Sequence, residues 1–303
     1  MLSFSTSWNA GSGKSGKDII REILDLGFDA IELGHGLSGP VVYEMLELQK
    51  RIPFVVSSLH NFCPLPPEVL VDQPDCYEFT SPRPDDRARA VRLTLQTIDM
   101  AERFEAPVVV VHAGRIRALK LTSRLRGLVH EGRFLSKEFA RIKLEAVKSR
   151  EGTGGEYARR ALQCLAEILT YASKKGIRIG IENREHYEAV PSEREFEDFL
   201  QRLNEPNVGY WHDFGHAQIK QNLALLDHGD WLDRMGSRAL GCHVHDVKWP
   251  FEDHRAPFTG EINYEKLVPK LPKDCLFVFE LRPLIPREQI VAAADRWRKL
   301  FCT

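Results

Sequence analysis

Short apolar, β-rich runs alternate with longer amphipathic segments along the whole 303-residue chain. The apolar runs predict strands near 2–8, 28–33, 54–60, 107–112, 177–182, 207–213, 239–246 and 275–281. The segments between them have the apolar spacing of helices near 17–26, 40–51, 85–104, 156–175, 193–203, 217–227, 263–270 and 286–300. Eight strand–helix units in this order predict an α/β fold, a single (β/α)8 barrel over residues 1–303.

Two long stretches interrupt this alternation. Residues 61–84 form a proline-rich segment that is too long for an ordinary strand-to-helix connection, and loops of that length are usually lids or binding loops. Residues 113–155 form an insertion after the fourth strand. Within it, 134–150 has a helical pattern that we expect to end before a flexible GTGG at 152–155. The insertion therefore predicts a helical addition to the barrel.

This insertion is strongly basic, although the chain as a whole is nearly neutral. Its 115–150 portion carries 11 Lys or Arg side chains against three Glu, a local charge of +8, whereas the whole chain carries -1. The overall charge demands neither a nucleic-acid nor a membrane partner, but the insertion leaves contacts with a phosphate backbone open. A solvated amphipathic helix or a contact between subunits of a homo-oligomer is an equally good interpretation.

Composition points to an ordinary cytoplasmic protein. The first residues, MLSFSTSWNAG, have no basic start and no long apolar stretch, and no run of about 18 apolar residues occurs, so we expect no signal peptide and no membrane span. The cysteines are Cys63, Cys76, Cys164, Cys242, Cys275 and Cys302. They form no CxxC pair, which disfavours a thiolate zinc site or redox motif and indicates a reducing compartment.

Four of the predicted strands end in a carboxylate or an imidazole. Glu182 follows IRIGI, Asp213 follows VGYWH, His243 follows LGC and Glu280 follows LFVF. In a parallel α/β barrel the carboxyl ends of all strands open onto one face, and that face carries the chemistry. Each residue alone has an ordinary alternative, such as a surface salt bridge or a helix cap. Three carboxylates and one histidine on one face predict a divalent-metal site.

Other polar residues are expected at the same face. His60 and His112 end the third and fourth strands, and His216 follows Asp213 in a D-x-x-H pattern. His254 follows the seventh strand, with Glu252 two residues before it. A single histidine at a strand end is usually a satisfied buried group, but several beside a metal site favour further metal or substrate contacts. The site would therefore hold one to three ions.

The first strand-to-helix loop contains a glycine-rich sequence, Gly11 to Lys17, that approaches a nucleotide-binding motif. Neither reading frame completes GxxxxGK[ST], because Asp18 or Trp8 occupies a required position. We therefore interpret it as a flexible loop. A weaker hypothesis is that Lys14 and the loop amides contact an anionic substrate at the start of the helix.

The segments SLHNF, VVVVHAG, IGIENRE, HDFGHA, HVHDVK with DHRAPFTGEINY, and FELRP resemble those of the xylose-isomerase-like TIM barrels. That superfamily includes sugar isomerases and epimerases and the endonuclease IV group (AP endonuclease family 2). The resemblance spans nearly the whole chain. For the isomerases and epimerases it implies one ion held by Glu182, Asp213, His243 and Glu280. His243 is preferred over His245 because the ligand of the family precedes an acidic residue by three positions. His216 matches a substrate contact.

The same resemblance to the endonuclease IV group implies three zinc ions held by a longer set of residues. The counterparts in this chain are His60, His112, Glu182, Asp213, His216, His243, His254 and Glu280. Glu252 stands where that group has an aspartate, two residues before its histidine, and Asp253 is adjacent. The basic insertion is not part of the common pattern.

Two enzymatic functions follow as expectations. The first is a sugar or sugar-phosphate isomerase or epimerase that uses zinc or manganese and transfers protons through an enediolate with Glu182 and Glu280. The second is a multinuclear zinc phosphoesterase. A non-catalytic metal-binding barrel is a third class, which the complete set of acids disfavours.

In the isomerase reading, His216 orients the substrate, and Arg184 and Arg282 bind a phosphate or carboxylate. The aromatic residues expected to line sugar faces are Trp8, Phe62, Trp211 and Trp249. Each of them has barrel packing as its alternative interpretation.

Overall fold

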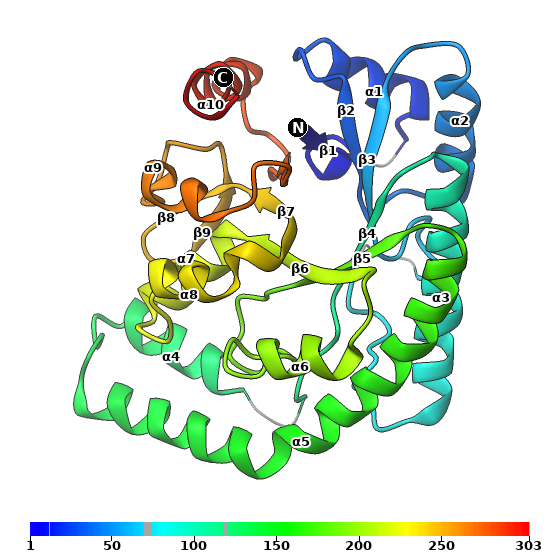
Figure 1. Cartoon of the computed structure of the whole chain (residues 1–303). Helices are drawn as coiled ribbons and strands as arrows, with labels where there is room; N and C mark the ends of the chain where they lie inside the picture. Colours follow the sequence, from blue (N-terminus) through cyan, green and yellow to red (C-terminus); the bar gives the residue numbers. More distant parts are fainter. Residues whose placement is uncertain (12, 70–73, 118–119, 303) are drawn as a thin grey trace.

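The protein is an eight-stranded closed parallel barrel surrounded by helices (Figure 1). The computed structural model describes residues 1–11, 13–69, 74–117 and 120–302. The barrel strands are β1 (Leu2–Ser5), β2 (Ala30–Leu33), β3 (Val55–His60), β4 (Val108–Val111), β5 (Arg178–Glu182), β6 (Val208–Asp213), β7 (Ala239–Val244) and β10 (Leu276–Phe279). They neighbour one another in the order β1-β10-β7-β6-β5-β4-β3-β2, and β1 also pairs with β2. The predicted barrel and its eight strands are confirmed, although the observed strands are mostly shorter.

Trp211 fills the barrel interior, where it is fully buried among Val108, Val110, Leu276 and Val278. It fits because glycines stand beside it on the neighbouring strands. A Cβ atom on Gly241 of β7 would lie 2.3 Å from the Trp211 ring. The expectation that Trp211 lines a sugar face is therefore wrong, since its side chain is part of the packed core.

Helices follow the strands on the outside of the barrel. They are α1 (Gly16–Leu24), α2 (Gly39–Gln49), α3 (Pro84–Arg103), α4 (Leu121–His130), α5 (Lys137–Lys174), α6 (Phe196–Leu203), α7 (Phe214–Asn222), α8 (His228–Met235), α9 (Tyr264–Leu267) and α10 (Arg287–Phe301). Short 3₁₀ turns span Thr6–Trp8, Gly236–Arg238 and Val268–Lys270. α4 and α8 were not predicted. α7 begins three residues earlier than expected, because Asp213 caps it directly at the end of β6.

An antiparallel hairpin follows β7 and was also not predicted. It consists of β8 (Asp246–Lys248) and β9 (Glu252–Arg255). His254 on β9 has a left-handed backbone conformation, with φ of 51°. The hairpin matters for function because it carries His254 back toward the mouth of the barrel.

The predicted break at GTGG does not exist, because these residues lie inside α5, a single helix of 38 residues. Contacts with the barrel support the helix at this point. Arg150 is buried and donates to the carbonyl oxygens of Tyr187 (2.6 Å) and Ala189 (2.7 Å), and it pairs with Glu195. Gly154 is buried against the same Glu195: a Cβ atom on Gly154 would lie 3.3 Å from the Glu195 Oε1 atom. Tertiary packing thus overrides the low helix propensity of glycine.

The insertion forms an α4–α5 arm, defined here as residues 121–150. In Figure 1, the first half of α5 runs along the lower edge of the molecule with α4 beside it, and the second half turns upward beside α3. Several basic residues of the arm pair with its three glutamates, for example Arg124 with Glu145 (2.9 Å). In the part of the chain that the structure describes, no helix combines the length and apolar character needed to cross a membrane.

Candidate metal centre

The carboxyl ends of four strands bring Glu182, Asp213, His243 and Glu280 together. β6 and β7 pair with Asp213 opposite His243, so these two side chains leave the barrel at the same level. The Nδ1 atom of His243 lies 3.5 Å from Glu182, 3.7 Å from Asp213 and 3.3 Å from Glu280, each time to a carboxylate oxygen. All four residues are buried.

His243 is oriented so that one ring nitrogen faces these three carboxylates. Its Nε2 lies 3.2 Å from the buried Glu32 carboxylate, which also accepts a hydrogen bond from Ser58 (2.7 Å). Among the described residues Nδ1 has no hydrogen-bond partner, although three carboxylates lie within ion-pair distance of it. Burial opposes protonation of His243, yet Glu280, Glu32 and Glu182 raise its pKa well above its usual range. Three buried carboxylates around this nitrogen need a positive charge between them, which a proton on the ring or a bound cation supplies. The residues present therefore fit a divalent ion with one nitrogen and three oxygen ligands.

The electrostatics of this group support ionised acids around a positive charge. Burial opposes ionisation of Glu182, yet His112 and His243 hold its pKa well below its usual range. Burial likewise opposes ionisation of Glu280, and His243 and His254 lower its pKa well below normal. These acids are therefore available as anionic ligands.

A second group adjoins the first through Glu182. The Oε2 atom of Glu182 lies 3.2 Å from Nε2 of His60 and 3.2 Å from Nε2 of His112. His60 donates its Nδ1 proton to the Asn61 carbonyl oxygen (3.1 Å), so its Nε2 lone pair also faces the carboxylate. The group of His60, Glu182 and His243 places its ligand atoms within 4.8 Å of one another. This geometry fits a second ion, for which Glu182 would be a shared ligand.

His112 is held by Asp75 and Arg184. Its Nδ1 donates to Asp75 (2.7 Å), and its Nε2 accepts from Arg184 (2.8 Å). Arg184 also contacts Glu182 at 3.2 Å and lies 3.8 Å from Asp75. Burial opposes ionisation of Asp75, but His112 and Arg184 hold its pKa far below normal. Asp75 belongs to the predicted 61–84 loop, of which residues 70–73 lie outside the described part.

A third group lies on the α7 and β9 side. Asp213 caps α7 by accepting from the backbone of His216 (2.6 Å), so it serves both the helix and the site. The His216 ring lies 3.1 Å from Glu182. His245 stacks on His254 with ring centroids 4.0 Å apart, and their ligand atoms lie within 4.8 Å of Glu280. His245 accepts from the His254 backbone at Nδ1 and therefore donates its Nε2 proton to Asp213 (3.1 Å).

Four predicted contacts are not brought to this centre. Glu252 turns outward and pairs with Arg255 (2.6 Å) and Arg282 (2.5 Å), because both guanidinium groups satisfy its carboxylate there. The Arg282 guanidinium is therefore paired with Glu252 and does not face the metal centre. Trp249 is 44% exposed and packs edge-on against Phe134 of the insertion, with centroids 5.5 Å apart. Phe62 is buried in the core and lines no open face.

The sequence analysis missed Glu32 and Asp75, and it named Asp253 and His245 without selecting them for the site. Glu32 is a fully buried carboxylate at the end of β2, so the strand-end rule that found Glu182 also applies to it. Asp253, rather than Glu252, faces the histidines: its Oδ2 lies 3.4 Å from His254 Nδ1. The alternation in HVH places His245 on the same strand face as His243, so the sequence does indicate His245. No local pattern indicates Asp75, because the position of Asp75 depends on the path of a long loop.

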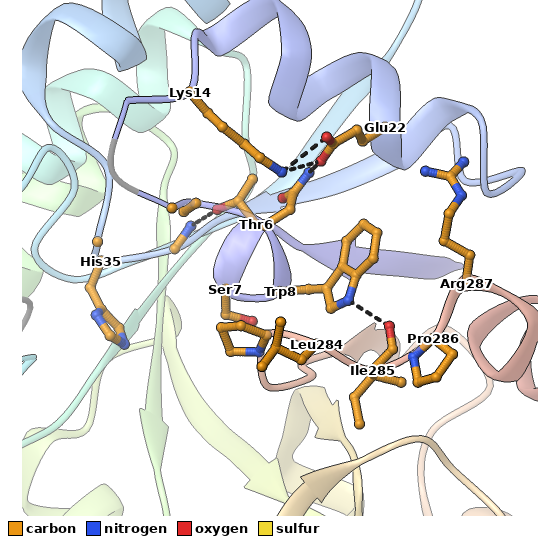
Figure 2. Close-up of a pocket in the computed structure, with 16 residues that line it drawn as sticks. Thr6, Ser7, Trp8, Lys14, Glu22, His35, Leu284, Ile285, Pro286 and Arg287 are labelled. Atoms are coloured by element: carbon orange, nitrogen blue, oxygen red, sulfur yellow. Dashed lines mark hydrogen bonds and ion pairs between the residues drawn. The ribbon is translucent and has the colours of Figure 1, made fainter.

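A pocket of about 670 Å³ lies beside the centre, at the ends of β1, β2 and β10 (Figure 2). Its His35 ring lies 4.9 Å from the His60 ring. Trp8 forms one wall, as expected, and donates its indole N–H to the Ile285 carbonyl oxygen (3.1 Å). Pro283, Leu284 and Pro286 contribute further apolar surface near Trp8. The pocket therefore offers a largely apolar extension of the metal centre.

The glycine-rich loop borders this pocket but is not arranged to bind an anion. Lys14 points to Glu22 in Figure 2, and its ammonium lies 2.7 and 2.9 Å from the two carboxylate oxygens. The first amides of α1, at Gly16 and Lys17, donate to Glu44. Ser12 lies outside the described residues. Both the lysine and the helix start are thus already neutralised, and the weaker hypothesis of an anion contact there is wrong.

Comparisons with known proteins agree with this architecture. A profile described as "Xylose isomerase-like TIM barrel" matches residues 20–300. An uncharacterized protein of Methanocaldococcus jannaschii, MJ1311, is 28% identical over 109 residues. The match covers 35% of this chain and 36% of the relative. The matched part of this chain therefore spans about a third of the length of that protein.

Solved structures match over nearly the full length. A D-tagatose 3-epimerase-like protein has 20% identity and a TM-score of 0.69, with 99% of this chain and 96% of that chain covered. A D-psicose 3-epimerase from Clostridium cellulolyticum H10 has 13% identity and a TM-score of 0.68, with 99% of each chain covered. At these identities the likeness is one of fold.

Proposed function

Because this chain belongs to the xylose isomerase-like TIM barrel family, we propose that it is a divalent-metal-dependent isomerase or epimerase of a sugar or sugar phosphate. The observation that carries the proposal is the convergence of the buried carboxylates of Glu182, Asp213 and Glu280 on the Nδ1 atom of His243. One of the similar structures is named a D-psicose 3-epimerase and another a D-tagatose 3-epimerase-like protein, which agrees with this substrate class.

Glu182, Asp213, His243 and Glu280 would hold the ion. When bound, a divalent ion supplies polarisation of a sugar carbonyl and its neighbouring hydroxyl, which makes the adjacent C–H more acidic. Glu182 stands at the end of β5 and Glu280 just after β10, and β6 and β7 lie between these strands. The two carboxylates therefore approach from different sides. One would remove the proton from carbon, and the other would return a proton to the enediolate of the sugar.

Other residues would orient the substrate. His216 faces the centre from α7, and Arg184 contributes a guanidinium beside Glu182 and His112. Burial opposes protonation of His216, but Asp213 and Glu182 raise its pKa, so its ring is poised to donate to a sugar hydroxyl. The pocket beside His35 would exclude water from part of the substrate through its apolar wall.

The test is proton exchange with solvent on a panel of ketopentoses, ketohexoses and their phosphates in D2O, with zinc- or manganese-loaded protein. We expect deuterium at the carbon that epimerises or isomerises. Glu182→Gln should retain an ion through the remaining ligands and lose turnover by a factor of about 10² or more. Glu44→Gln, in α2, is the matched control and should keep turnover, because Glu44 contacts the first amides of α1 and not the metal centre.

Two outcomes would contradict the proposal. One is the absence of turnover and of deuterium exchange for every sugar in the panel, although the ion is bound. The other is a Glu182→Gln variant with wild-type turnover, because then no proton passes through this carboxylate.

A multinuclear zinc phosphoesterase is the second candidate, and the group of His60, His112 and Glu182 favours it. Imidazole nitrogens suit zinc, and paired ions stabilise both oxygens of a phosphoryl displacement. Metal content by mass spectrometry, on protein purified without chelator, separates the two functions. About one ion per chain, especially manganese, supports the isomerase or epimerase. Two or three zinc ions direct the assays to phosphoesters.

A further inference from the structure

A second pocket, of about 390 Å³, lies between the segment after β4, the start of α4 and the segment after β5. Its lining consists of Arg115, Arg117, Lys120, Ser123, His186 and Glu188. We call it the Arg115–Lys120 pocket. It is distinct from the apolar pocket beside His35, because most of its lining side chains carry or can carry charge.

The two arginines of this pocket are held from behind by one buried carboxylate. The Nε atom of Arg115 donates to Glu78 Oε1 (3.0 Å), and the Nε atom of Arg117 donates to Glu78 Oε2 (2.8 Å). The Glu78 side chain is 1% exposed, whereas the arginine side chains are 44% and 53% exposed. Within the described residues, the terminal nitrogens of both guanidinium groups have no hydrogen-bond partner. Glu78 thus fixes two donor groups while leaving their outer edges open.

The backbone that carries these arginines is also fixed. The hydroxyl of Thr80 accepts from the Arg115 N–H and donates to the Arg115 carbonyl oxygen, both at 3.0 Å. Arg115 forms a β-bridge with Ala189 in the segment after β5. Gly114 has a φ of 115° and lies so close to Thr80 that a Cβ atom would be 2.3 Å from its hydroxyl oxygen. The arginines therefore stand on an ordered turn rather than on a free loop.

The acids near the pocket are already used. Glu188 accepts from the backbone of Leu121 (2.5 Å) and Thr122 (2.8 Å), so it caps α4 and neutralises that helix start. Glu185 pairs with Arg126 (2.9 Å) and with His186 (3.2 Å). Among the described residues Lys120 has no ion pair. The pocket therefore presents an excess of positive charge.

The pocket adjoins the candidate metal centre. Arg115 follows the metal-centre residue His112 by three positions, and His186 follows Arg184 by two. Asp75, which holds His112, is also close enough to Arg115 for the guanidinium to lower its pKa. These short connections are the reason to consider one substrate for both places.

We infer that the Arg115–Lys120 pocket binds the phosphate group of a sugar-phosphate substrate whose sugar portion lies at the metal centre. The inference rests on the proposed function, because the reaction of the sugar portion is the one proposed above. The binding of phosphate by the pocket does not depend on that reaction. Two guanidinium edges and an ammonium provide the planar and point-charge donors that a phosphate dianion accepts. The substrate class is thereby narrowed from sugars in general to phosphorylated sugars.

The first test measures the binding of inorganic phosphate to metal-loaded protein by calorimetry. Arg115→Gln/Arg117→Gln should weaken the phosphate Kd at least about tenfold. The control Arg124→Gln/Arg141→Gln removes the same charge from the α4–α5 arm, where both residues pair with Glu145, and should leave the Kd within about twofold. Equal Kd values in all three proteins would mean that phosphate binds at the metal centre alone, which overturns the inference.

Replacing both arginines leaves Glu78 buried without partners, so a milder variant is included. Lys120→Gln breaks no ion pair among the described residues and should weaken phosphate binding about threefold with unchanged circular dichroism. An unchanged Kd in this folded variant and in single Arg117→Gln contradicts the pocket.

Turnover separates this inference from the proposed function. With a sugar phosphate and the same unphosphorylated sugar as substrates, the pocket variants should raise KM only for the phosphate. Turnover of both sugars with equal KM and no phosphate binding would reject the pocket and keep the isomerase. Phosphate binding that is sensitive to the arginines, without any sugar turnover, would keep the pocket and reject the isomerase.

Discussion

Glu182 contacts four histidines of the candidate metal centre. Its Oε2 atom lies 3.2 Å from both His60 and His112, its Oε1 atom lies 3.1 Å from His216, and His243 is 3.5 Å away. A single carboxylate therefore links two possible ion positions. The orientation of the imidazoles around it depends in turn on residues such as Glu32 and Asp75, which accept their outer protons.

Asp75→Asn tests this orientation. The amide cannot supply the negative charge that holds the His112 Nδ1 proton, so we expect the affinity for the ion beside Glu182, which His112 contacts, to fall about 10- to 100-fold. The measurement is competition with a chromophoric chelator. Asp274→Asn, at an exposed position, is the control and should not change the affinity. An Asp75→Asn variant with unchanged affinity would show that this carboxylate does not position His112.

His228 gives a stability prediction that depends on pH. Its fully buried ring lies 3.0 Å from the His212 ring, and burial lowers its pKa to about 3. The unfolded chain, with a histidine pKa of about 6.5, binds this proton first. The stability contributed by neutral His228 is thus complete above about pH 6.5 and is lost as the pH falls toward 3, by up to about 1.4 kcal/mol per unit.

His228→Gln should therefore flatten the acid side of the stability profile. Urea titrations at pH 7, 6 and 5 measure the free energy of unfolding, and the decrease should be smaller in the variant than in the wild type. His130→Gln, at an exposed position, should keep the wild-type slope. Identical slopes for His228→Gln and the wild type would contradict the prediction.

At the scale of elements, periodicity predicted the strands well because each one is a short apolar run that the barrel buries. It failed for α5, where the local glycines suggested a break but contacts of Arg150 and Gly154 with the barrel maintain the helix. It also failed for the β8–β9 hairpin, whose short, partly polar strands have no apolar alternation. The strand-end acids were predictable, whereas Asp75 was not, since no local pattern determines how a long loop returns to the barrel.

The glycines of α5 provide a direct test. Gly152 and Gly155 are helical, lack left-handed φ values and have no atom within 4 Å of the place where a Cβ would lie. Gly152→Ala/Gly155→Ala should raise the free energy of unfolding by roughly 1 kcal/mol per site, because alanine has the higher helix propensity. Gly154→Ala is the contrast, since its Cβ would press on Glu195 and should give less. Denaturant titration measures both, and a destabilised double variant would indicate that α5 bends there.

At the scale of the whole molecule, barrel closure concentrates charge at one end. Glu32, Glu182, Asp213 and Glu280 are all buried at that end, from four different strands or strand ends. Such a concentration of acids is tolerable only with nearby cations. The histidines provide part of that charge, and a bound ion would provide the rest.

Removal of metal should therefore destabilise the protein. An ion at 1,000 times its Kd stabilises the folded state by about 4 kcal/mol, which corresponds to a Tm change on the order of 10 °C. Thermal unfolding is measured before chelation, after chelation, and after zinc or manganese is returned. A Tm that chelation does not change, in protein shown to contain metal beforehand, would contradict this prediction.

The continuity of α5 has a mechanical consequence. Its 38 residues form one helix with a contour length of about 57 Å, which changes direction near its middle (Figure 1). The second half packs on the barrel, and the first half carries the α4–α5 arm. Because the helix is unbroken at Gly152 and Gly155, its backbone connects the arm directly to the barrel. A molecule that docks on the arm would therefore move relative to the barrel mouth through bending of α5.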